Sequence, residues 1–450
     1  MTDFNSKNVL LLGYGKEGTS THEFLLKQYP GVIISVADQE NVTPIQPVKN
    51  LHTGKNYLSA LLQYEIVIKS PGISYSHTEI KEYLVKGGTI TSHINVFFNH
   101  CIGQTIGITG SKGKSTTSAL IAQILKEKYQ DVRLGGNIGT PALTLLENST
   151  PETIFVLELS SQQLERSIKS PHCAVLLDIF PGHLDHHDSY ADYVKAKVEI
   201  IARQSPKDFV VYNPSNSQLT DYLVKAKARK VTFSLESYPD LNAYVENDRI
   251  KTLYQSKSVE IMGVQEIPLI GKGNLENTVV ASLIGIMYEV PAESIKKAVT
   301  SFKSLPHRLE FVKKVNGVSY YNDSLASIPE AVIHAINAIG PTLETLIVGG
   351  FDRAADYSEL GKKIAESSVK HLILFPETGE KIWTEVQKNL VRKITVVSVR
   401  SMTEAVQKAR ELTSEGSACA LSPASPSFGL FKNYKDRGDQ FKKCVEELTS

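Results

Sequence analysis

A glycine-rich loop between an apolar run and an apolar helix is the feature that most narrows the folds open to this chain. The loop Gly110-Ser111-Lys112-Gly113-Lys114-Ser115-Thr116 follows the apolar run 105–109 and precedes the apolar stretch 119–125. A strand that enters a helix through such a turn begins a βαβ unit, in which helices cover parallel strands. The loop therefore predicts an α/β fold.

The composition of this loop indicates phosphate binding. Glycines free backbone N–H groups to surround phosphate oxygens, Lys114 supplies a point charge, and a hydroxyl of the following residues can bind Mg²⁺. The strict pattern places a glycine where this chain has Ile108, so we interpret the loop as a variant in which Gly110 makes the turn. The alternative is a basic turn that binds no nucleotide. The candidate nucleotide contacts are Gly110, Ser111, Lys112, Gly113, Lys114, Ser115, Thr116 and Thr117.

Short apolar runs alternate with helical stretches along the whole chain, which is typical of α/β domains with mostly parallel sheets. A length of 450 residues suits about three domains, and we place them at residues 1–97, 98–304 and 305–450. We interpret the polar stretch 232–268 as short antiparallel strands. Strands are expected at residues 9–12, 32–36 and 66–68, which we interpret as buried, and at residues 105–109, 154–157, 174–177, 209–211, 346–348, 371–374, 395–397 and 418–421.

Composition excludes several classes of protein. Lys and Arg number 49 against 48 Asp and Glu, so a net charge of +1 gives no field that would attract nucleic acid or an anionic membrane. The 4 cysteines are scattered without a CxxC pair, which argues against a disulfide framework and favours a reducing compartment. The sequence shows no leader and no apolar run of membrane-spanning length. We therefore expect a cytoplasmic protein without nucleic-acid or membrane partners. We also expect a monomer.

A second glycine motif, near the N-terminus, indicates diphosphate binding. Residues 13–18 read Gly-Tyr-Gly-Lys-Glu-Gly after a predicted strand, and Asp38 ends the next strand. The spacing is typical of dinucleotide sites. The motif itself provides only two things, however: glycines that let a ligand approach the backbone closely, and a helix N-terminus that attracts a diphosphate. A UDP-sugar therefore fits as well as a nicotinamide cofactor, and a plain turn without ligand stays open. The candidate contacts are Gly15, Lys16, Gly18 and Asp38, with Ser70 and Gly72 from a second turn.

Glu158 and His183 follow predicted strands and are candidate metal ligands. Ligands of open α/β sheets gather beyond the C-terminal strand ends, where a carboxylate can hold Mg²⁺ opposite the phosphate loop. Glu158 could instead lie in the first turn of a helix, where an acid is favoured. The histidine-rich segment 183–187 also suggests zinc, but the sequence has no HExxH motif and no spaced cysteine set to support it.

Lys197 differs from the other lysines because it shares a predicted helix face with apolar residues. In a helix that starts near Tyr190, Lys197 lies on one face with Tyr190, Val194 and Ile201. Such a lysine either extends its charge to solvent or is functional. A desolvated lysine has a lowered pKa and a nucleophilic neutral amine, which CO₂ would convert into a carbamate able to ligate Mg²⁺.

Taken together, these motifs resemble the Mur ligase family in order and spacing. Several unlinked motifs in the family's order are far more specific than any one alone, and the resemblance covers essentially all 450 residues. It is strongest to the members that add glutamate to UDP-N-acetylmuramoyl-L-alanine during peptidoglycan precursor synthesis. The segments that carry it are 109–116, 135–139, 158–164, His183 with Asp185, 306–308, 322–324, 349–350 and 421–424.

The resemblance implies a UDP-binding Rossmann-like domain, a central ATPase domain and a C-terminal Rossmann-like domain. The implied cofactors are ATP and Mg²⁺, the latter as two ions. The implied catalytic set is Lys114, Glu158, His183 and Lys197, and the metal would be held by Ser115, Glu158, His183 and a carbamylated Lys197. Further ATP contacts would be Asn277, Arg308 and Asp323. The UDP-sugar would also contact Asn137, and the glutamate would contact Arg353, Ser427, Phe428 and Tyr434.

Two positions depart from the family pattern. Leu325 stands where the family has a lysine two places after the aspartate of Asn-Asp-Ser, and Arg353 replaces the lysine that follows the Gly-Gly pair. Arginine can grip a carboxylate through two hydrogen bonds, so the second change keeps the charge and alters the geometry. The first removes a cation from the glutamate pocket. We expect D-glutamate as the substrate, with L-glutamate as the alternative.

The chemistry that these residues permit is amide-bond formation through an acyl phosphate, because a carboxylate must be activated before an amine attacks it. We expect the third domain to close over the site, since acyl phosphates hydrolyse readily. A nicotinamide-dependent oxidoreductase would leave the loop 110–116 unexplained. A nucleotide switch would bind ATP without releasing ADP on addition of substrates. Another Mur ligase or a folylpolyglutamate synthase is the nearest rival.

Overall fold

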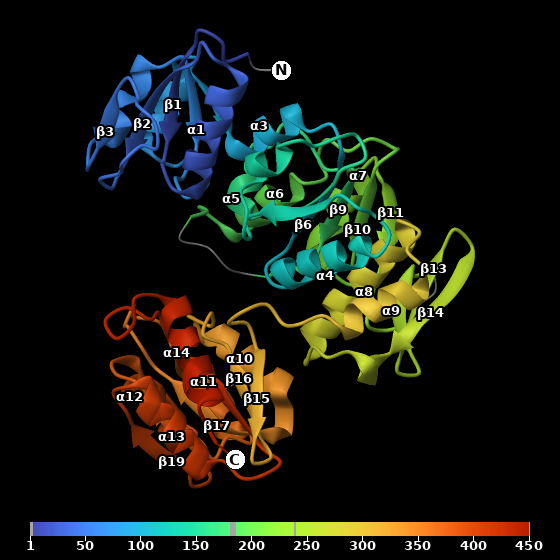
Figure 1. Ribbon diagram of the computed structural model, residues 1–450, viewed down its shortest axis with the longest axis vertical. Helices are drawn as coiled ribbons and strands as arrows, with labels where there is room; N and C mark the ends of the chain where they lie inside the picture. Colours follow the sequence, from blue (N-terminus) through green and yellow to red (C-terminus); the bar gives the residue numbers. More distant parts are fainter. Residues whose placement is uncertain (1–2, 181–185, 238–239, 450) are drawn as a thin grey trace. The chain divides into compact units, whose positions relative to one another are not determined.

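The computed structural model describes residues 3–180, 186–237 and 240–449, which form two compact units (Figure 1). The first unit comprises residues 1–266 and 276–300, and the second comprises residues 267–275 and 301–450. The first unit contains two parallel sheets and a small antiparallel one, and the second unit contains one mixed sheet.

The N-terminal sheet of the first unit is fully parallel, with strand order β3-β2-β1-β4-β5. Side chains of β1 alternate between two apolar clusters, with Val9 and Leu11 on one face and Leu10 and Leu12 on the other. Burial on both faces explains why this strand reads as an unbroken apolar run. The elements are β1 (Asn8–Leu12), α1 (Lys16–Gln28), β2 (Ile33–Asp38), β3 (Leu51–Thr53), β4 (Ile66–Lys69), α2 (Thr78–Val85), β5 (Thr89–Ser92) and α3 (His93–His100).

The central sheet is also parallel, with order β11-β10-β9-β6-β8-β7. Because β8 and β9 flank β6, the segments that follow these three strands meet at one edge of the sheet. Its strands are β6 (Gln104–Thr109), β7 (Val132–Gly136), β8 (Ile154–Glu158), β9 (Cys173–Leu176), β10 (Phe209–Tyr212) and β11 (Arg229–Thr232). Its helices are α4 (Lys114–Lys126), α5 (Ser161–Leu164), α6 (Tyr190–Val198), α7 (Thr220–Lys225), α8 (Lys272–Met287) and α9 (Ala292–Thr300).

The stretch 232–268 contains the short antiparallel strands that the sequence predicts. They are β12 (Ala243–Glu246), β13 (Arg249–Tyr254) and β14 (Lys257–Gly263), paired in that order. Asn247 with Asp248, and Gln255 with Ser256, have positive φ at the two connections. Two consecutive positive-φ residues are the requirement of a tight hairpin turn whose twist matches that of the strands.

The sheet of the second unit has the order β15-β16-β20-β17-β18-β19, parallel except for β15. Strand β20 again alternates between two apolar clusters, with Ala418 and Ala420 on one face and Cys419 and Leu421 on the other. The strands are β15 (Glu310–Val315), β16 (Val318–Asn322), β17 (Leu343–Val348), β18 (His371–Leu374), β19 (Thr395–Ser398) and β20 (Ala418–Leu421). The helices are α10 (Pro329–Ile339), α11 (Ser358–Glu366), α12 (Thr378–Lys388), α13 (Met402–Leu412) and α14 (Tyr434–Glu446).

Two details of the sequence analysis are corrected. Helix α6 starts at Tyr190 as predicted but ends at Val198, so Ile201 lies beyond it and is buried from the turn that follows. Helix α4 starts at Lys114, inside the phosphate-loop motif, rather than after it. Both differences arise because helix ends are set by capping and packing as well as by apolar periodicity.

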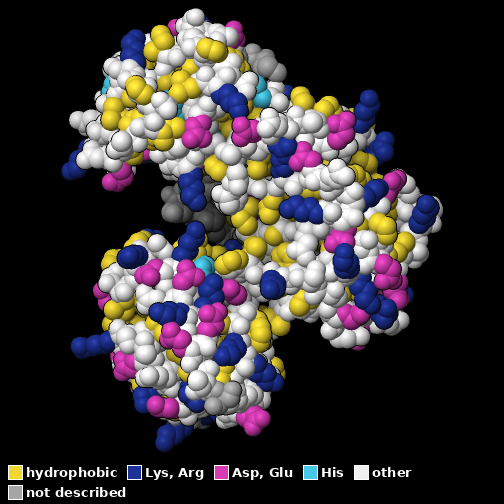
Figure 2. Space-filling view, in the orientation of Figure 1, with side chains coloured by type: hydrophobic (Ala, Val, Ile, Leu, Met, Phe, Trp, Pro, Cys, Tyr) yellow, Lys and Arg dark blue, Asp and Glu magenta, His cyan; other side chains and the backbone are white. Residues whose placement is uncertain are grey.

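The surface carries no single-signed field on the face shown, where basic and acidic side chains are interspersed over both units (Figure 2). The 4 cysteines are all free. Across the described ranges, no helix is both long enough and apolar enough to cross a membrane.

Candidate active site

The loop between β6 and α4 has the backbone that its glycines make available. Gly113 caps α4 in the left-handed region, with φ +83, and Gly110 has φ +153. A Cβ atom on Gly110 would lie 2.6 Å from Cβ of Leu177, and one on Gly113 would lie 2.5 Å from Oδ1 of Asn277. A side chain at either position would therefore strain the backbone and collide with a neighbouring segment.

Lys114 folds back over this loop. Its Nζ donates to the carbonyl oxygens of Gly110, at 2.9 Å, and Ser111, at 3.2 Å. The loop is tied to the segment after β9, because the Ser111 amide donates to the Asp178 carbonyl at 2.9 Å and its hydroxyl to the Phe180 carbonyl at 2.8 Å. These bonds hold the lysine charge at the N-terminus of α4, where the helix dipole also favours an anion.

The remaining candidate nucleotide contacts of the first unit are gathered around the same helix start. Thr117 donates from its hydroxyl to Oδ1 of Asn277 at 3.0 Å, which joins α8 to α4. Nζ of Lys112 lies 5.5 Å from the centre of the Phe180 ring. Ser115 is partly exposed, whereas Thr116 is buried. The structure thus brings Asn277 to a residue that lies 160 positions earlier in the chain.

Glu158 is the last residue of β8, beside this loop, and one of its two carboxylate oxygens is available to a ligand. The residue is 2 % exposed, and its Oε1 accepts a hydrogen bond from Nδ2 of Asn137 at 2.7 Å. Among the described residues, Oε2 of Glu158 has no hydrogen bond partner although it is buried. A buried, unpartnered carboxylate oxygen is costly unless a cation completes it, so this donor fits Mg²⁺.

Lys197 points from α6 at the phosphate loop. The residue is 1 % exposed, its Nζ donates to the Gly110 carbonyl at 2.8 Å, and the same atom lies 4.5 Å from the centre of the Tyr193 ring. Burial lowers the pKa of Lys197 well below its ordinary value, the charge of Lys114 lowers it further, and the Glu158 carboxylate opposes both. Lys197 therefore does not extend to solvent, which was the alternative that its helix face left open.

His183 lies outside the described residues, so its predicted role as a metal ligand stays a prediction. Within the described ranges, no group of three His, Cys, Asp or Glu side chains lies close enough together to hold a metal ion. His187, from the same histidine-rich segment, shares a hydrogen bond of 2.9 Å between its Nε2 and the Ser161 hydroxyl.

The N-terminal glycine motif forms a tight turn into α1. Gly15 is the residue before the helix, and a Cβ atom added to it would have no neighbour within 4 Å, whereas a Cβ on Gly18 would collide with the Gly13 carbonyl. Asp38 braces the turn, since its Oδ2 accepts from the Tyr14 amide at 2.6 Å. The Ser70 hydroxyl donates to the Gly13 carbonyl at 2.9 Å, so the two predicted turns lie side by side. Lys16 is exposed, and a Cβ on Gly72 would meet open space.

Two charged residues beside this turn were missed by the sequence analysis. Lys69, at the end of β4, is 2 % exposed and donates from Nζ to the carbonyls of Ile73 at 2.5 Å and Ser70 at 3.1 Å. Burial lowers its pKa to about 8. Glu17 accepts a hydrogen bond from Nε2 of Gln163 at 2.5 Å, and burial raises its pKa to about 7. A lysine that closes an apolar strand was the available signal for Lys69; Glu17 lay inside the motif itself.

In the second unit, Asp323 follows β16 and is 6 % exposed. Its Oδ1 accepts from the Leu309 amide at 3.1 Å and its Oδ2 from the Ser422 hydroxyl at 2.8 Å. Arg308 precedes Leu309, so it lies in the segment that this carboxylate holds. The amide of Leu325 donates to the His307 carbonyl at 3.0 Å.

The candidate glutamate contacts of this unit fall into two groups. Cζ of Arg353 lies 5.5 Å from the centre of the Phe428 ring, and the Phe351 ring meets Phe428 edge-on at 5.9 Å. Ser427 is 4 % exposed beside them in the chain. Tyr434 opens α14, where its ring meets His307 edge-on at 5.9 Å.

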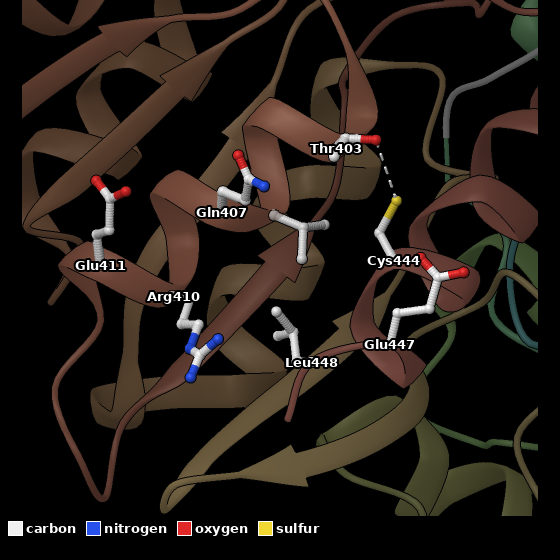
Figure 3. A pocket seen from close by; sticks show the side chains of 8 residues that line it. Thr403, Gln407, Arg410, Glu411, Cys444, Glu447 and Leu448 are labelled. Carbon is white, nitrogen blue, oxygen red and sulfur yellow. Dashed lines mark hydrogen bonds between the residues drawn. The ribbon is translucent and has the colours of Figure 1, made fainter. Parts of the chain in front are cut away.

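A pocket elsewhere in the second unit has none of these residues in its wall. It measures about 530 Å³ and lies between α13 and α14 (Figure 3). Its lining includes Thr403, Arg410 and Cys444, with the Thr403 hydroxyl 3.7 Å from Sγ of Cys444. By contrast, Asp323, Arg353 and Ser427 lie in the segments that follow β16, β17 and β20, where ligand contacts are expected in an open α/β sheet.

Comparison with known proteins gives the family. The MurD-like N-terminal domain of Mur ligases matches residues 7–92, the Mur ligase middle domain matches residues 108–285, and the Mur ligase glutamate ligase domain matches residues 307–425. A curated relative from Acetivibrio thermocellus, a UDP-N-acetylmuramoylalanine--D-glutamate ligase, is 34% identical over 98% of this chain and 97% of its own length. The chain belongs to the Mur ligase family.

Other relatives of this Mur ligase carry the same printed name. The protein from Caldicellulosiruptor bescii is 33% identical over 99% of both chains, and that from Symbiobacterium thermophilum is 35% identical over 89% of this chain and 88% of its own. The three-domain architecture predicted from sequence is confirmed, because the three family models follow one another along the chain.

Solved Mur ligases share the fold at low identity. MurF ligase from Thermotoga maritima in complex with ADP has a TM-score of 0.59 at 18% identity and covers 99% of this chain and 97% of its own. UDP-N-acetylmuramate-alanine ligase MurC from the same organism has a TM-score of 0.60 at 14% identity and covers 98% of this chain and 99% of its own. At these identities the likeness establishes the arrangement of elements alone.

Proposed function

We propose that this Mur ligase joins D-glutamate to UDP-N-acetylmuramoyl-L-alanine at the expense of ATP, as a step of peptidoglycan precursor synthesis. The observation that carries the reaction class is the meeting of Lys114, Glu158 and Lys197 at one phosphate loop. The substrate follows from full-length relatives that are named for this ligation. We also propose that the chain works in the cytoplasm and that it acts as a monomer.

The proposed reaction has two steps. The alanyl carboxylate attacks the γ-phosphorus of ATP, so that ADP leaves and an acyl phosphate forms. The neutral glutamate amine then attacks the acyl carbon, a C–N bond forms, phosphate leaves, and the nitrogen gives up one proton to solvent and keeps the other as the amide N–H. Both steps spread negative charge over phosphoryl oxygens, which the Lys114 ammonium and the N–H groups of the loop stabilise. No covalent bond to the protein is needed.

The metal site is proposed at the strand ends beside the loop. Mg²⁺ would neutralise charge on the transferring phosphoryl group, with Glu158, Ser115 and His183 as ligands, and we propose two ions. The buried Oε2 of Glu158 supports this placement. We further propose that Lys197 is carbamylated: its amine adds to CO₂, a C–N bond forms and one proton leaves, giving an anion where the structure has a buried amine.

The remaining contacts are assigned by unit. In the first unit, the UDP-sugar would meet the turns at Gly15 to Gly18 and Ser70 to Gly72, with Asn137 nearer to Glu158; Asp38 would act through the turn that it braces. In the second unit, the ATP contacts would be Arg308 and Asp323, and the glutamate contacts Arg353, Ser427, Phe428 and Tyr434. We place the domain boundaries at residues 1–97, 98–304 and 305–450.

The last part of the proposal concerns the residue that binds the side chain of the glutamate. Leu325 offers no charge, so Arg353 is the cation proposed to hold the glutamate side-chain carboxylate. Its position over Phe428 fits a guanidinium that stacks on an aromatic ring while it binds a carboxylate through its edge.

An ADP-release assay tests the proposal. The purified chain receives ATP, MgCl₂ and UDP-N-acetylmuramoyl-L-alanine, with D-glutamate in one arm and L-glutamate in the other. We expect ADP release that requires all components and is faster by about 100-fold or more with D-glutamate, because the wrong hand leaves polar groups unpaired. Lys114→Ala should abolish release, and Lys126→Ala, at the far end of the same helix, should not.

Equal rates with the two enantiomers would overturn the stereochemical assignment. Absence of ADP release with either one would overturn the ligase itself, and an active Lys114→Ala variant would remove the phosphate loop from the reaction.

A further inference from the structure

Among the described residues, the largest fully buried side chain is an arginine that no proposed step uses. Arg437 lies in the first turns of α14 and is 0 % exposed. Burial lowers its pKa to about 10, and within the described ranges no acidic side chain forms an ion pair with it. A buried charge without a counter-ion is costly, so its hydrogen bonds are expected to serve a purpose.

The guanidinium connects two segments that are far apart in sequence. Its Nε donates to the Ser324 hydroxyl at 3.0 Å and its Nη2 to the Ser324 carbonyl at 2.9 Å, while Nη1 donates to the Ser425 carbonyl at 3.0 Å. The Ser324 hydroxyl in turn donates to the Tyr434 carbonyl at 2.8 Å, which closes the network on the start of α14. The planar fork of an arginine fixes the directions of all these bonds at once.

A third segment reaches the same side chain. Gly350 has φ +152, and a Cβ atom at this position would lie 3.2 Å from Nη1 of Arg437. The amide of the next residue, Phe351, donates to the Pro426 carbonyl at 2.9 Å, so the turn after β17 lies directly against the segment that Arg437 holds.

Each of these segments carries a proposed ligand contact. Asp323 adjoins Ser324, Ser427 and Phe428 follow Ser425, and Arg353 follows Gly350. The three segments come from the ends of β16, β20 and β17, which are neighbours in the sheet. Arg437 thus lies beneath the place where the nucleotide and glutamate contacts of this unit are brought together.

We propose that Arg437 is a positioning residue that fixes the spacing between the ATP-contact segment at Asp323 and the glutamate-contact segment at Ser427. It touches neither substrate and acts through the Ser324 and Ser425 segments. This inference rests on the proposed ligase function, because it assigns both segments to that reaction.

The test compares steady-state kinetics of the full chain with Arg437→Met and Arg437→Lys, using ADP release. Met keeps the length without donors, and Lys keeps the charge without the fork. We expect KM for glutamate and for ATP to rise about 10- to 100-fold in both variants, because a shift of about 1 Å in a positioning group has effects of this size. KM for UDP-N-acetylmuramoyl-L-alanine should change by less than about 2-fold, since its proposed contacts are in the other unit.

Arg410→Met, which removes an exposed arginine of the same unit from α13, is the matched control and should leave all three KM values unchanged. A merely structural role predicts a different result: a smaller active fraction, hence lower kcat, with every KM unchanged, and that result would overturn the proposal. Recovery of both KM values by Arg437→Lys would also overturn it, because charge alone would then suffice.

If Arg437→Met does not fold, Ser324→Ala removes one acceptor of the network and should raise the same two KM values by a smaller factor. Unchanged KM values in that variant would count against the inference. A wild-type chain without ADP release would refute the ligase function itself, whereas an active wild type with unaltered variants would refute only the role of Arg437.

Discussion

Two lysines of α6, Lys195 and Lys197, show how strongly the surroundings of a side chain decide its chemistry. Lys195 is exposed, whereas Lys197 is buried against Tyr193 and bonded to the phosphate loop. Desolvation favours the neutral amine, which is the form that reacts with CO₂. The two lysines lie two positions apart on one helix but differ in reactivity toward CO₂, because Lys195 faces solvent and Lys197 faces the phosphate loop.

Replacement of Lys197 tests its proposed carbamate. Lys197→Ala should lower the rate of ADP release by about 100-fold or more, because it removes the proposed anion that would help to hold the metal. Short-chain carboxylic acids should restore part of the rate by occupying the vacated space. Lys195→Ala is the matched control and should keep full activity. Equal rates for wild type and Lys197→Ala would show that the residue only fills space.

Burial of Glu17 makes the stability of the folded chain depend on pH. Burial raises its pKa from an ordinary value of 4.5 to about 7, so the folded chain holds this proton more tightly than the unfolded chain. The associated stability is fully present below pH 4.5 and is lost as the pH rises through about 7. Glu17→Gln should therefore raise the free energy of unfolding at pH 8 by on the order of 1–2 kcal/mol, with little effect at pH 4.

Urea denaturation of the ligand-free chain at the two pH values measures this effect. Glu23→Gln, on an exposed position of the same helix, is the control and should show no such pH dependence. A stability difference between Glu17→Gln and wild type that is the same at both pH values would contradict the assignment.

At the scale of secondary-structure elements, two glycines of the turn into α1 have different roles: one is required for packing and the other leaves space for a ligand. Strand β1 and helix α1 are joined by a turn in which Gly18 is pressed against the Gly13 carbonyl, while Gly15 faces open space in an ordinary backbone conformation, with φ −74. The sequence motif treats these glycines alike. The structure distinguishes a packing requirement at Gly18 from room for a ligand at Gly15.

The pair Gly18→Ala and Gly15→Ala tests this distinction. Gly18→Ala should destabilise the chain by about 1–3 kcal/mol, because a backbone carbonyl cannot move away cheaply. Gly15→Ala should change the free energy of unfolding by less than about 1 kcal/mol but raise KM for the UDP-sugar, since the added methyl group occupies the space proposed for the diphosphate. Thermal unfolding and ADP release measure the two effects, and equal stability of the variants would contradict the packing argument.

At the scale of the whole molecule, the proposed contacts are divided between the two compact units. The phosphate loop, the proposed metal ligands and the turns proposed to bind the UDP-sugar belong to the first unit, and the proposed glutamate contacts belong to the second. The chain passes between the units after residues 266, 275 and 300. A reactive acyl phosphate needs protection from water, and closure of domains around substrates is the usual means.

Small-angle X-ray scattering tests this closure. A non-hydrolysable ATP analogue together with UDP-N-acetylmuramoyl-L-alanine and Mg²⁺ should reduce the radius of gyration, and the same mixture should leave Lys114→Ala unchanged because nucleotide binding is lost. A radius that does not respond in the wild-type chain would contradict closure on substrate binding.

Much of the fold and the family could be predicted from residues that are adjacent in the chain. Eleven strands were predicted from apolar runs, because a strand buried on both faces has few polar positions, whereas β3, β5, β7, β11, β15 and β16 were not predicted. The loop 110–116 was predicted from residues that are adjacent in the chain. The family followed from several such local motifs, each complete within a few residues, and the comparisons confirm it. The ends of α4 and α6 were less accurate, because capping and packing decide where a helix stops.

Only the tertiary structure decided which side chains come into contact and which are excluded from water. Asn277 reaches Thr117, Lys197 reaches Gly110, and Arg437 reaches Ser324 across separations of 160, 87 and 113 positions. Sequence pattern carries no distance information at that range, since these encounters depend on strand order. Burial of Lys69, Lys197 and Arg437 is likewise a property of the packed sheets, because the same side chains on an isolated helix or strand would lie in water.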